Sequence, residues 1–241
     1  MNNDLMFSSR SQAWATRFET FNSIQEQLGR DYLLDPCCHK ETAKCSEYYT
    51  EEDDMFKHNW TQELIQKGYD QDEAQFFCNP EYGTQQSKFV KKFIQECEKG
   101  GRGDVLIPSR TDTKLFHEII LPKAKAIYFV KGRITFGSDE YWEWIWSQPT
   151  MEHINGKMTK NSLYEKFGRA TAAPFPSMVV SFDTESVFDT GKDPLMSNIV
   201  LPKFKYEGKM GKVVGVGDKK IEVLSEEQLD LDLSDLVEMR K

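Results

Sequence analysis

Residues 75–83 of this 241-residue chain read QFFCNPEYG. The apolar run that ends at Cys78 predicts a short buried strand, and Asn79-Pro80 predicts the turn that ends it. Residues 32–36, YLLDP, repeat the arrangement with Asp35 at the strand end. Ligands of open α/β sheets bind beyond the carboxyl ends of the strands. Two strand ends that carry an amide and a carboxyl group therefore predict a ligand site.

The alternation of strands and helices continues along the chain. Apolar residues recur at helical spacing in residues 11–28, which predicts a helix whose apolar face begins at Trp14 and which Gly29 ends. Residues 40–75 are polar and irregular, with an acidic run at 51–54. Further helices are predicted at 87–97 and 113–120, and further strands at 104–108, 126–130 and 177–182. This order predicts an α/β fold, a mostly parallel sheet flanked by helices.

The composition is that of a folded protein. Hydrophobic residues make up 39% of the chain and aromatic residues 12%, which is enough for a sizeable core. No apolar run reaches the roughly 18 residues of a membrane span, and the first residues lack the features of a signal peptide. We therefore expect a cytoplasmic protein without a membrane partner. The sequence predicts no particular oligomeric state.

The five cysteines do not predict a metal site. Their only cluster is Cys37, Cys38 and Cys45 together with His39, and this spacing matches no tetrahedral zinc pattern. An odd number of cysteines also gives no complete disulfide framework. We interpret the cluster as small apolar side chains packed at a strand end.

The net charge of −8 is distributed unevenly. Residues 1–83 carry 16 acidic and 7 basic side chains, whereas residues 84–136 carry 11 basic and 5 acidic ones. A basic middle region on an acidic chain could face the phosphates of a nucleic acid. A solvated helix face is the alternative that charge alone leaves open.

Residues 79–82 carry groups that suit chemistry on the amine of adenine. That amine is a weak nucleophile because its lone pair is delocalised into the ring. The side-chain oxygen of Asn79 and the carbonyl of Pro80 could each accept one of its N–H bonds, and the ring of Tyr82 could stack on the base. Because Asn-Pro is also an ordinary turn starter, a purely structural turn is the alternative.

Seven pieces of the chain, taken in order, resemble the phage-encoded DNA N6-adenine methyltransferase family. No single piece is specific, but the set occurs in the family's order. The pieces lie within residues 11–16, 34–38, 48–60, 77–83, 106–117, 130–136 and 173–177.

The resemblance implies a Rossmann-like class I methyltransferase that uses S-adenosylmethionine and no metal. It implies methylation of adenine N6 in double-stranded DNA, which would protect phage DNA from host restriction. Asn79, Pro80 and Tyr82 match the catalytic motif. The resemblance assigns cofactor contacts to Asp35, near the methionine part, and to Asp54, near the adenosine. It also assigns contacts to Cys37 and Asn79. A turn aspartate and a solvated acidic run are the alternatives for Asp35 and Asp54.

We predict a methyltransferase domain over residues 1–183, with residues 137–172 inserted for target recognition or as a small subdomain with its own aromatic core. Residues 184–241 form an acidic extension that includes a hairpin. The insertion contains three tryptophans and four basic residues. We expect phosphate contacts from basic residues of the middle region and the insertion, namely Arg110, Lys114, Arg133, Lys157 and Lys160.

The chain departs from the family pattern at two points. Glu81 stands where the family has a second proline, and it adds a negative charge beside a site that must receive DNA. Arg17 stands where the family tends to have proline, and the first motif lacks a glycine-rich loop. Two alternatives therefore stay open. One is a catalytically silent relative that binds DNA or protein, and the other is a methyltransferase for another planar amide, such as a glutamine side chain.

Overall fold

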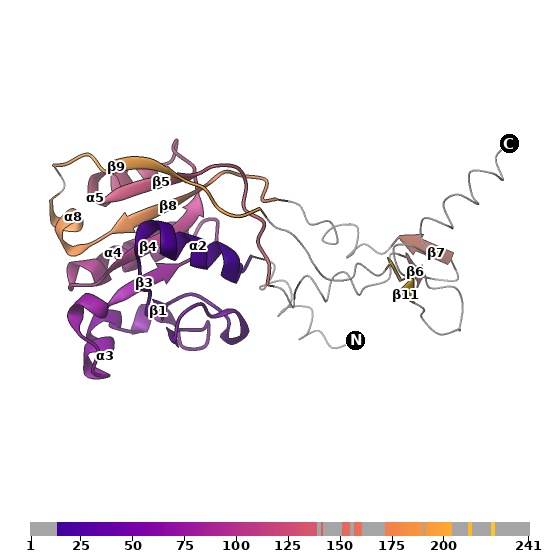
Figure 1. The fold of residues 1–241 in the computed structure, drawn as a ribbon, viewed down its shortest axis with the longest axis horizontal. Coiled ribbons are helices and arrows are strands. Elements are labelled where there is room, and N and C mark those ends of the chain that lie inside the picture. Colours follow the sequence, from indigo (N-terminus) through magenta and orange to yellow (C-terminus); the bar gives the residue numbers. More distant parts are fainter. Residues whose placement is uncertain are drawn as a thin grey trace. The chain divides into compact units, whose positions relative to one another are not determined.

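The computed structural model describes residues 14–138, 141, 151–154, 157–160, 172–189, 191–203, 212–213 and 223–224. These residues fall into two compact units. Those within Met1–Ser138 and Ala172–Lys203 form the first, here called the sheet unit, and those within Asp139–Thr171 and Phe204–Lys241 form the second. Figure 1 shows the elements of both units along the chain.

The sheet unit is built on seven strands in the order β2-β1-β3-β4-β8-β5-β9. Strand β8 is antiparallel to both of its neighbours, and every other pair in this sheet is parallel. The predicted α/β fold with a mostly parallel sheet is therefore confirmed. The strands are β1 (Leu34–Asp35), β2 (Glu47–Tyr48), β3 (Gln75–Cys78), β4 (Arg102–Pro108), β5 (Ala126–Val130), β8 (Ser177–Phe182) and β9 (Leu195–Ile199).

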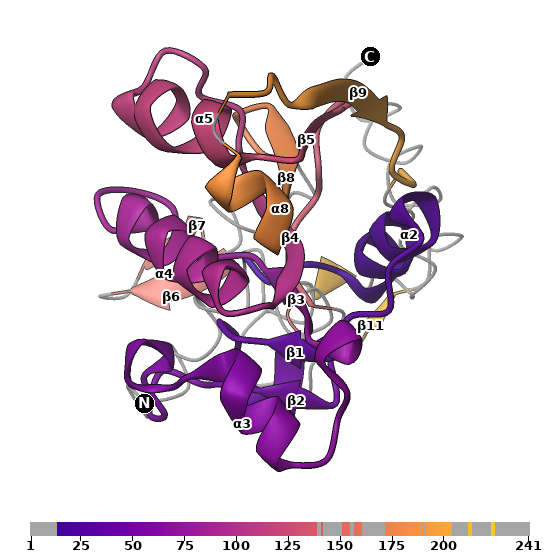
Figure 2. The same cartoon turned by 90° about the vertical axis from the view of Figure 1, so that its left-hand side faces the viewer.

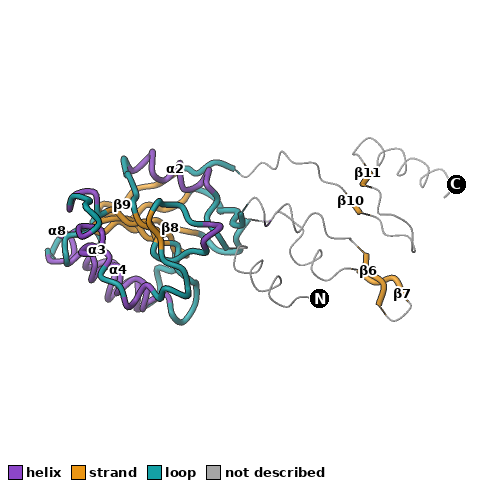
Figure 3. The backbone as a smooth tube through the Cα atoms, turned by 90° about the horizontal axis from the view of Figure 1, so that it is seen from below, coloured by secondary structure: helices purple, strands orange, loops and turns teal. Residues whose placement is uncertain are grey.

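Helices cover both faces of this sheet, as Figure 2 shows. Helix α2 lies on one face, and α3, α4, α5 and α8 lie on the other. Figure 3 shows the strands enclosed between these layers. The helices are α2 (Phe18–Leu28), α3 (Trp60–Gln66), α4 (Gln86–Glu98), α5 (Leu121–Lys123) and α8 (Thr184–Phe188), with 3-10 turns at Lys40–Thr42, Met55–Lys57 and Gln71–Glu73 and a π-helical turn at Leu115–Ile120.

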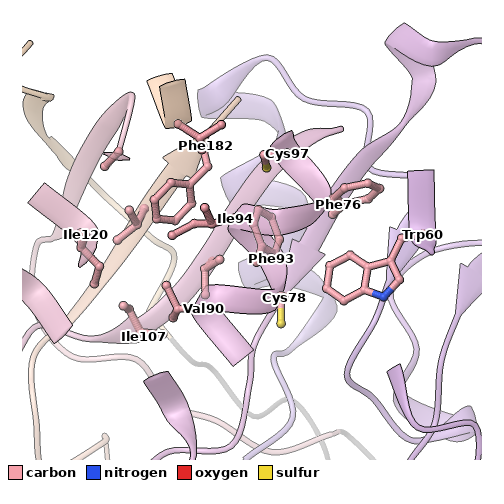
Figure 4. Close-up of a cluster of buried hydrophobic side chains, with 14 of the residues drawn as sticks. Trp60, Phe76, Cys78, Val90, Phe93, Ile94, Cys97, Ile107, Ile120 and Phe182 are labelled. Atoms are coloured by element: carbon pink, nitrogen blue, oxygen red, sulfur yellow. The ribbon is translucent and has the colours of Figure 1, made fainter. Parts of the chain in front are cut away.

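The alternation of side chains along β3 explains the two cores. Phe77 packs beneath α2 with Phe21 and Ile24, whereas its neighbour Phe76 points to the opposite face. There Phe76 contacts Trp60 of α3, with their ring centroids 5.4 Å apart. Figure 4 shows this larger core between α3, α4 and the sheet. Both faces of β3 are thus buried as far as Cys78, the residue that precedes Asn79.

Two sequence predictions are wrong in detail. Residues 40–75 read as irregular in the sequence, but they contain β2 and α3, and the fully buried Trp60 of α3 fills the core. Helix α2 begins at Phe18 rather than near residue 11, because Arg17 has the extended backbone of an N-cap. Trp14 therefore precedes the helix. Gly29 ends the helix in the left-handed conformation, with φ 60°, as its sequence predicts.

The sheet extends past the predicted domain boundary at residue 183. Strand β9 pairs in parallel with β5, so residues up to 203 belong to the sheet unit. In the second unit, two antiparallel strand pairs are described, and the rest of the hairpin predicted for the tail lies outside the described residues. The pairs are β6 (Met151–Ile154) with β7 (Lys157–Lys160), and β10 (Lys212–Val213) with β11 (Val223–Leu224).

Across the described ranges, no helix is both long enough and apolar enough to span a bilayer.

Candidate functional site

A pocket opens at the edge of the sheet where β1 and β3 end, and we call it the edge pocket. Its volume is about 700 Å³. The two strands are parallel, so their carboxyl ends meet at this edge. All six residues that the sequence assigns to catalysis or to the cofactor line it: Asp35, Cys37, Asp54, Asn79, Pro80 and Tyr82.

Asp35 ends β1 and is buried at the base of the edge pocket. Its two carboxylate oxygens accept hydrogen bonds from the main-chain N–H groups of Lys44, at 3.1 Å, and Cys37, at 3.4 Å. Burial raises the pKa of Asp35 to about 6, although the N–H of Lys44 and the Lys44 charge oppose that rise. A buried carboxylate of this kind is suited to hold a cationic group of a ligand.

The cysteines around Asp35 are thiols. Burial is the largest cause that raises the pKa of Cys38 and of Cys45 far above its ordinary value, so both stay protonated. Among the described residues, no group of three or more His, Cys, Asp and Glu side chains is placed to hold a metal ion.

Asp54 lies at the rim of the edge pocket in a strained loop. It has φ 57°, the left-handed region that aspartate tolerates better than most residues. Its carboxylate accepts a hydrogen bond from the main-chain N–H of Phe56 at 3.3 Å and pairs with Lys57 at 3.2 Å. The bond from Lys57 is the main reason that the pKa of Asp54 is lowered. Its charge therefore persists across the physiological range.

Asn79 and Tyr82 are joined within the turn that follows β3. The Tyr82 hydroxyl donates to Asn79 Oδ1 at 2.7 Å, and Asn79 Nδ2 donates to the main-chain carbonyl of Trp14 at 2.9 Å. Burial raises the pKa of Tyr82 well above its ordinary value, so this hydroxyl keeps its proton. Pro80 is buried, whereas Glu81 is exposed at the pocket rim.

Sequence reasoning missed the aromatic residues that surround Tyr82. Its ring contacts Phe175 and Phe136 edge-on, with centroids 5.4 and 6.0 Å away. Trp14 lies 6.2 Å from Tyr82 and stacks on Phe175 at 5.9 Å. The three partners come from separate loops, and only their clustering at one sheet edge reveals them.

The predicted phosphate contacts divide between the two units. Arg110 follows β4, Lys114 lies at the start of the helical turn that comes next, and Arg133 follows β5, so all three lie on segments that leave the carboxyl edge of the sheet. Their side chains are exposed. Lys157 and Lys160 belong to β7 of the second unit, and their side chains lie outside what the structure describes.

Comparison with known proteins gives two matches. The family model for DNA N-6-adenine-methyltransferase (Dam) matches residues 5–163, which is most of the chain. A DNA N-6-adenine-methyltransferase of Escherichia phage T1 is 26% identical over 115 residues, which cover 48% of this chain and 43% of that relative. The match thus spans less than half of either protein. No solved structure matches. The family model matches most of the chain, and the sheet unit has a mixed, Rossmann-like sheet. The chain therefore belongs to the DNA N-6-adenine-methyltransferase (Dam) family.

Proposed function

We propose that this protein transfers a methyl group from S-adenosylmethionine to N6 of adenine in double-stranded DNA. The observation that carries the proposal is the edge pocket, which brings Asp35, Asp54 and the 79–82 turn together at the carboxyl edge of the sheet. Family membership favours the same reaction. The biological role that we propose is protection of phage DNA from restriction in the cytoplasm of the host.

The edge pocket fits the cofactor in size and in chemistry. Its volume of about 700 Å³ lies within the range of roughly 300–1,000 Å³ that small-molecule sites occupy. S-adenosylmethionine supplies a methyl group carried on a positively charged sulfur. Asp35 would hold the cationic methionine part. Asp54 would accept hydrogen bonds from ribose hydroxyls, which would replace its ion pair with Lys57. Cys37 and Phe56 would contribute apolar contacts to the wall.

The 79–82 turn would prepare the target amine. Asn79 Oδ1 has two acceptor positions, of which the Tyr82 hydroxyl uses one. The second is available to an N6–H of adenine, and the carbonyl of Pro80 would accept the other N6–H. These acceptors favour a pyramidal nitrogen and stabilise the positive charge that grows on it in the transition state. N6 would form a bond to the methyl carbon as the carbon–sulfur bond of S-adenosylmethionine breaks, leaving a neutral thioether, and the methylated amine would then release one proton to water.

The basic loops would receive the DNA. Arg110, Lys114 and Arg133 lie on the same edge of the sheet as the edge pocket, and no ion pair involving them occurs within the described part of the chain. Basic side chains at the same edge of the sheet as an aromatic-lined pocket suit an enzyme that extrudes a base from a duplex.

A second candidate function rests on Glu81. Its carboxylate is exposed at the rim of the edge pocket, where it would repel DNA phosphates. This favours the catalytically silent relative, which would bind its partner without methylating it. The glutamine methyltransferase alternative uses the same acceptors but would not need the basic loops.

One experiment separates the three functions. The purified protein is incubated with S-adenosylmethionine labelled in the methyl group, first with unmethylated double-stranded DNA and then with unmethylated protein. The proposal expects label in N6-methyladenine of the DNA. Label in protein would support the glutamine alternative, and cofactor binding without transfer would support the silent relative.

A further inference from the structure

The orientation of the Asn79 amide depends on Trp14. An amide side chain has an acceptor end and a donor end, and rotation by 180° exchanges them. The Tyr82 hydroxyl does not decide between the two orientations, because a hydroxyl both donates and accepts. The main-chain carbonyl of Trp14 does decide, because a carbonyl only accepts. At 2.9 Å it requires the Nδ2 end of Asn79, so Oδ1 must face the other way.

The Trp14 carbonyl is itself held in place by packing. The Trp14 ring stacks on Phe175 and contacts Phe136, with both centroids 5.9 Å away. The next residue, Ala15, accepts a hydrogen bond from the main-chain N–H of Gly137 at 2.9 Å. Nevertheless 48% of Trp14 remains exposed at the pocket mouth. Trp14 thus contacts the aromatic residues through its ring and Asn79 through its main-chain carbonyl.

We infer that Trp14 is a positioning residue for Asn79: its ring fixes the carbonyl that turns the amide oxygen toward the amine to be methylated. This inference rests on the proposed function, because it assigns Asn79 Oδ1 as the acceptor. Trp14 acts through Asn79 and takes no proton from the substrate. Because the amide is already oriented, it does not have to rotate when the base binds.

The kinetic test uses Trp14→Ala, Trp14→Phe and a control, Phe188→Ala. Phe188 is 66% exposed at the end of α8, away from the edge pocket. Loosening the amide should lower kcat of Trp14→Ala by roughly 10- to 100-fold, as small misplacements of reacting groups do. The KM for DNA and the Kd for S-adenosylmethionine should change less than threefold, and Trp14→Phe should restore most of kcat. An unchanged kcat in Trp14→Ala, or a rise in KM alone, would overturn the inference.

A second readout needs no catalysis. Asn79→Asp keeps an acceptor but presents a carboxylate to the Trp14 carbonyl, so the contact should break. Acrylamide quenching of tryptophan fluorescence should then increase relative to the wild type. Quenching should not increase when the double variant Trp14→Phe/Asn79→Asp is compared with Trp14→Phe, because both proteins lack the Trp14 ring. If Asn79→Asp leaves quenching unchanged, the inference fails even in an active enzyme. If quenching rises in a protein that methylates nothing, the contact stands and only the proposed function fails.

Discussion

The hydroxyl of Tyr82 donates a hydrogen bond to Asn79 Oδ1 at 2.7 Å, so the two side chains that we propose to act on adenine are linked within the 79–82 turn. The Tyr82 ring also packs against Phe175 and Phe136. Tyr82 thus has two separable parts, a hydroxyl that bonds to Asn79 and a ring that packs.

Substitutions of Tyr82 should separate these parts. Tyr82→Phe keeps the ring, so DNA methylation should fall only severalfold. Tyr82→Ala removes the ring and should weaken the use of DNA by about 1–3 kcal/mol, the usual contribution of stacking on a base. Steady-state kinetics with both variants measures the difference, and thermal melting separates it from loss of stability. Equal defects in the two variants would show that the ring has no role of its own.

Binding of S-adenosylmethionine should depend on pH through Asp35. Burial raises the pKa of this carboxyl to about 6 in the free protein, and a bound cation would lower it again. Affinity should therefore be constant above this pKa and fall below it, approaching about tenfold per pH unit. Calorimetric titration from pH 5 to 8 measures this, and the protein should melt at a higher temperature with cofactor at neutral pH.

Asp35→Asn is the control for this profile. It should bind the cofactor weakly at every pH and lack the decline below the Asp35 pKa. A decline that persists in Asp35→Asn would assign the titration to another group in the pocket.

The charge of Glu81 should oppose DNA binding. Glu81→Gln removes the charge and keeps the size of the side chain, so the KM for DNA should fall severalfold while cofactor affinity stays the same. Glu81→Pro, which introduces the residue typical of the family, should preserve or raise activity. If the wild type is inactive and Glu81→Pro methylates DNA, the silent relative is the correct function for this chain.

The salt dependence of DNA binding should report the basic loops. Each of Arg110→Gln, Lys114→Gln and Arg133→Gln should reduce the slope of log K against log salt by about 0.9 if its side chain contacts one phosphate. Lys192→Gln is the matched control, because Lys192 is exposed but pairs with Asp189 at 2.6 Å. A slope unchanged in the three variants would move the DNA interface elsewhere.

The sequence predicts the central strands and the pocket end of the sheet because their signals are local. Strands β3, β4, β5 and β8 are apolar runs bounded by turns; Asn79 directly follows β3, and Asp35 follows the apolar run at 32–34 and ends β1. Strand β2 has two residues, and four of the five residues of β9 are exposed, so neither leaves a periodic pattern. Helix α3 is only seven residues long, so its buried apolar side chains, Trp60 and Leu64, are too few to define a helical period.

The contact of Asn79 with Trp14 could not be predicted at all. It joins residues 65 positions apart, and its acceptor is a main-chain carbonyl, which every residue has. The apolar spacing of residues 11–28 assigned Trp14 to the face of a helix, but the helix begins after it. Only the folded arrangement of three loops brings the aromatic residues around Tyr82 together.

Methyl transfer by Asn79→Ala, compared with the wild type, tests the central claim most directly. The measurement is incorporation of labelled methyl groups into N6-methyladenine of unmethylated DNA, with cofactor affinity measured in parallel. Loss of a preorganised acceptor should cost roughly 2.7–4 kcal/mol of transition-state stabilisation, about 100- to 1,000-fold in rate, by analogy with a lost oxyanion-hole donor. Cofactor affinity should stay within a few fold. If Asn79→Ala methylates DNA as fast as the wild type, Asn79 is not the catalytic acceptor and the proposed active site is wrong.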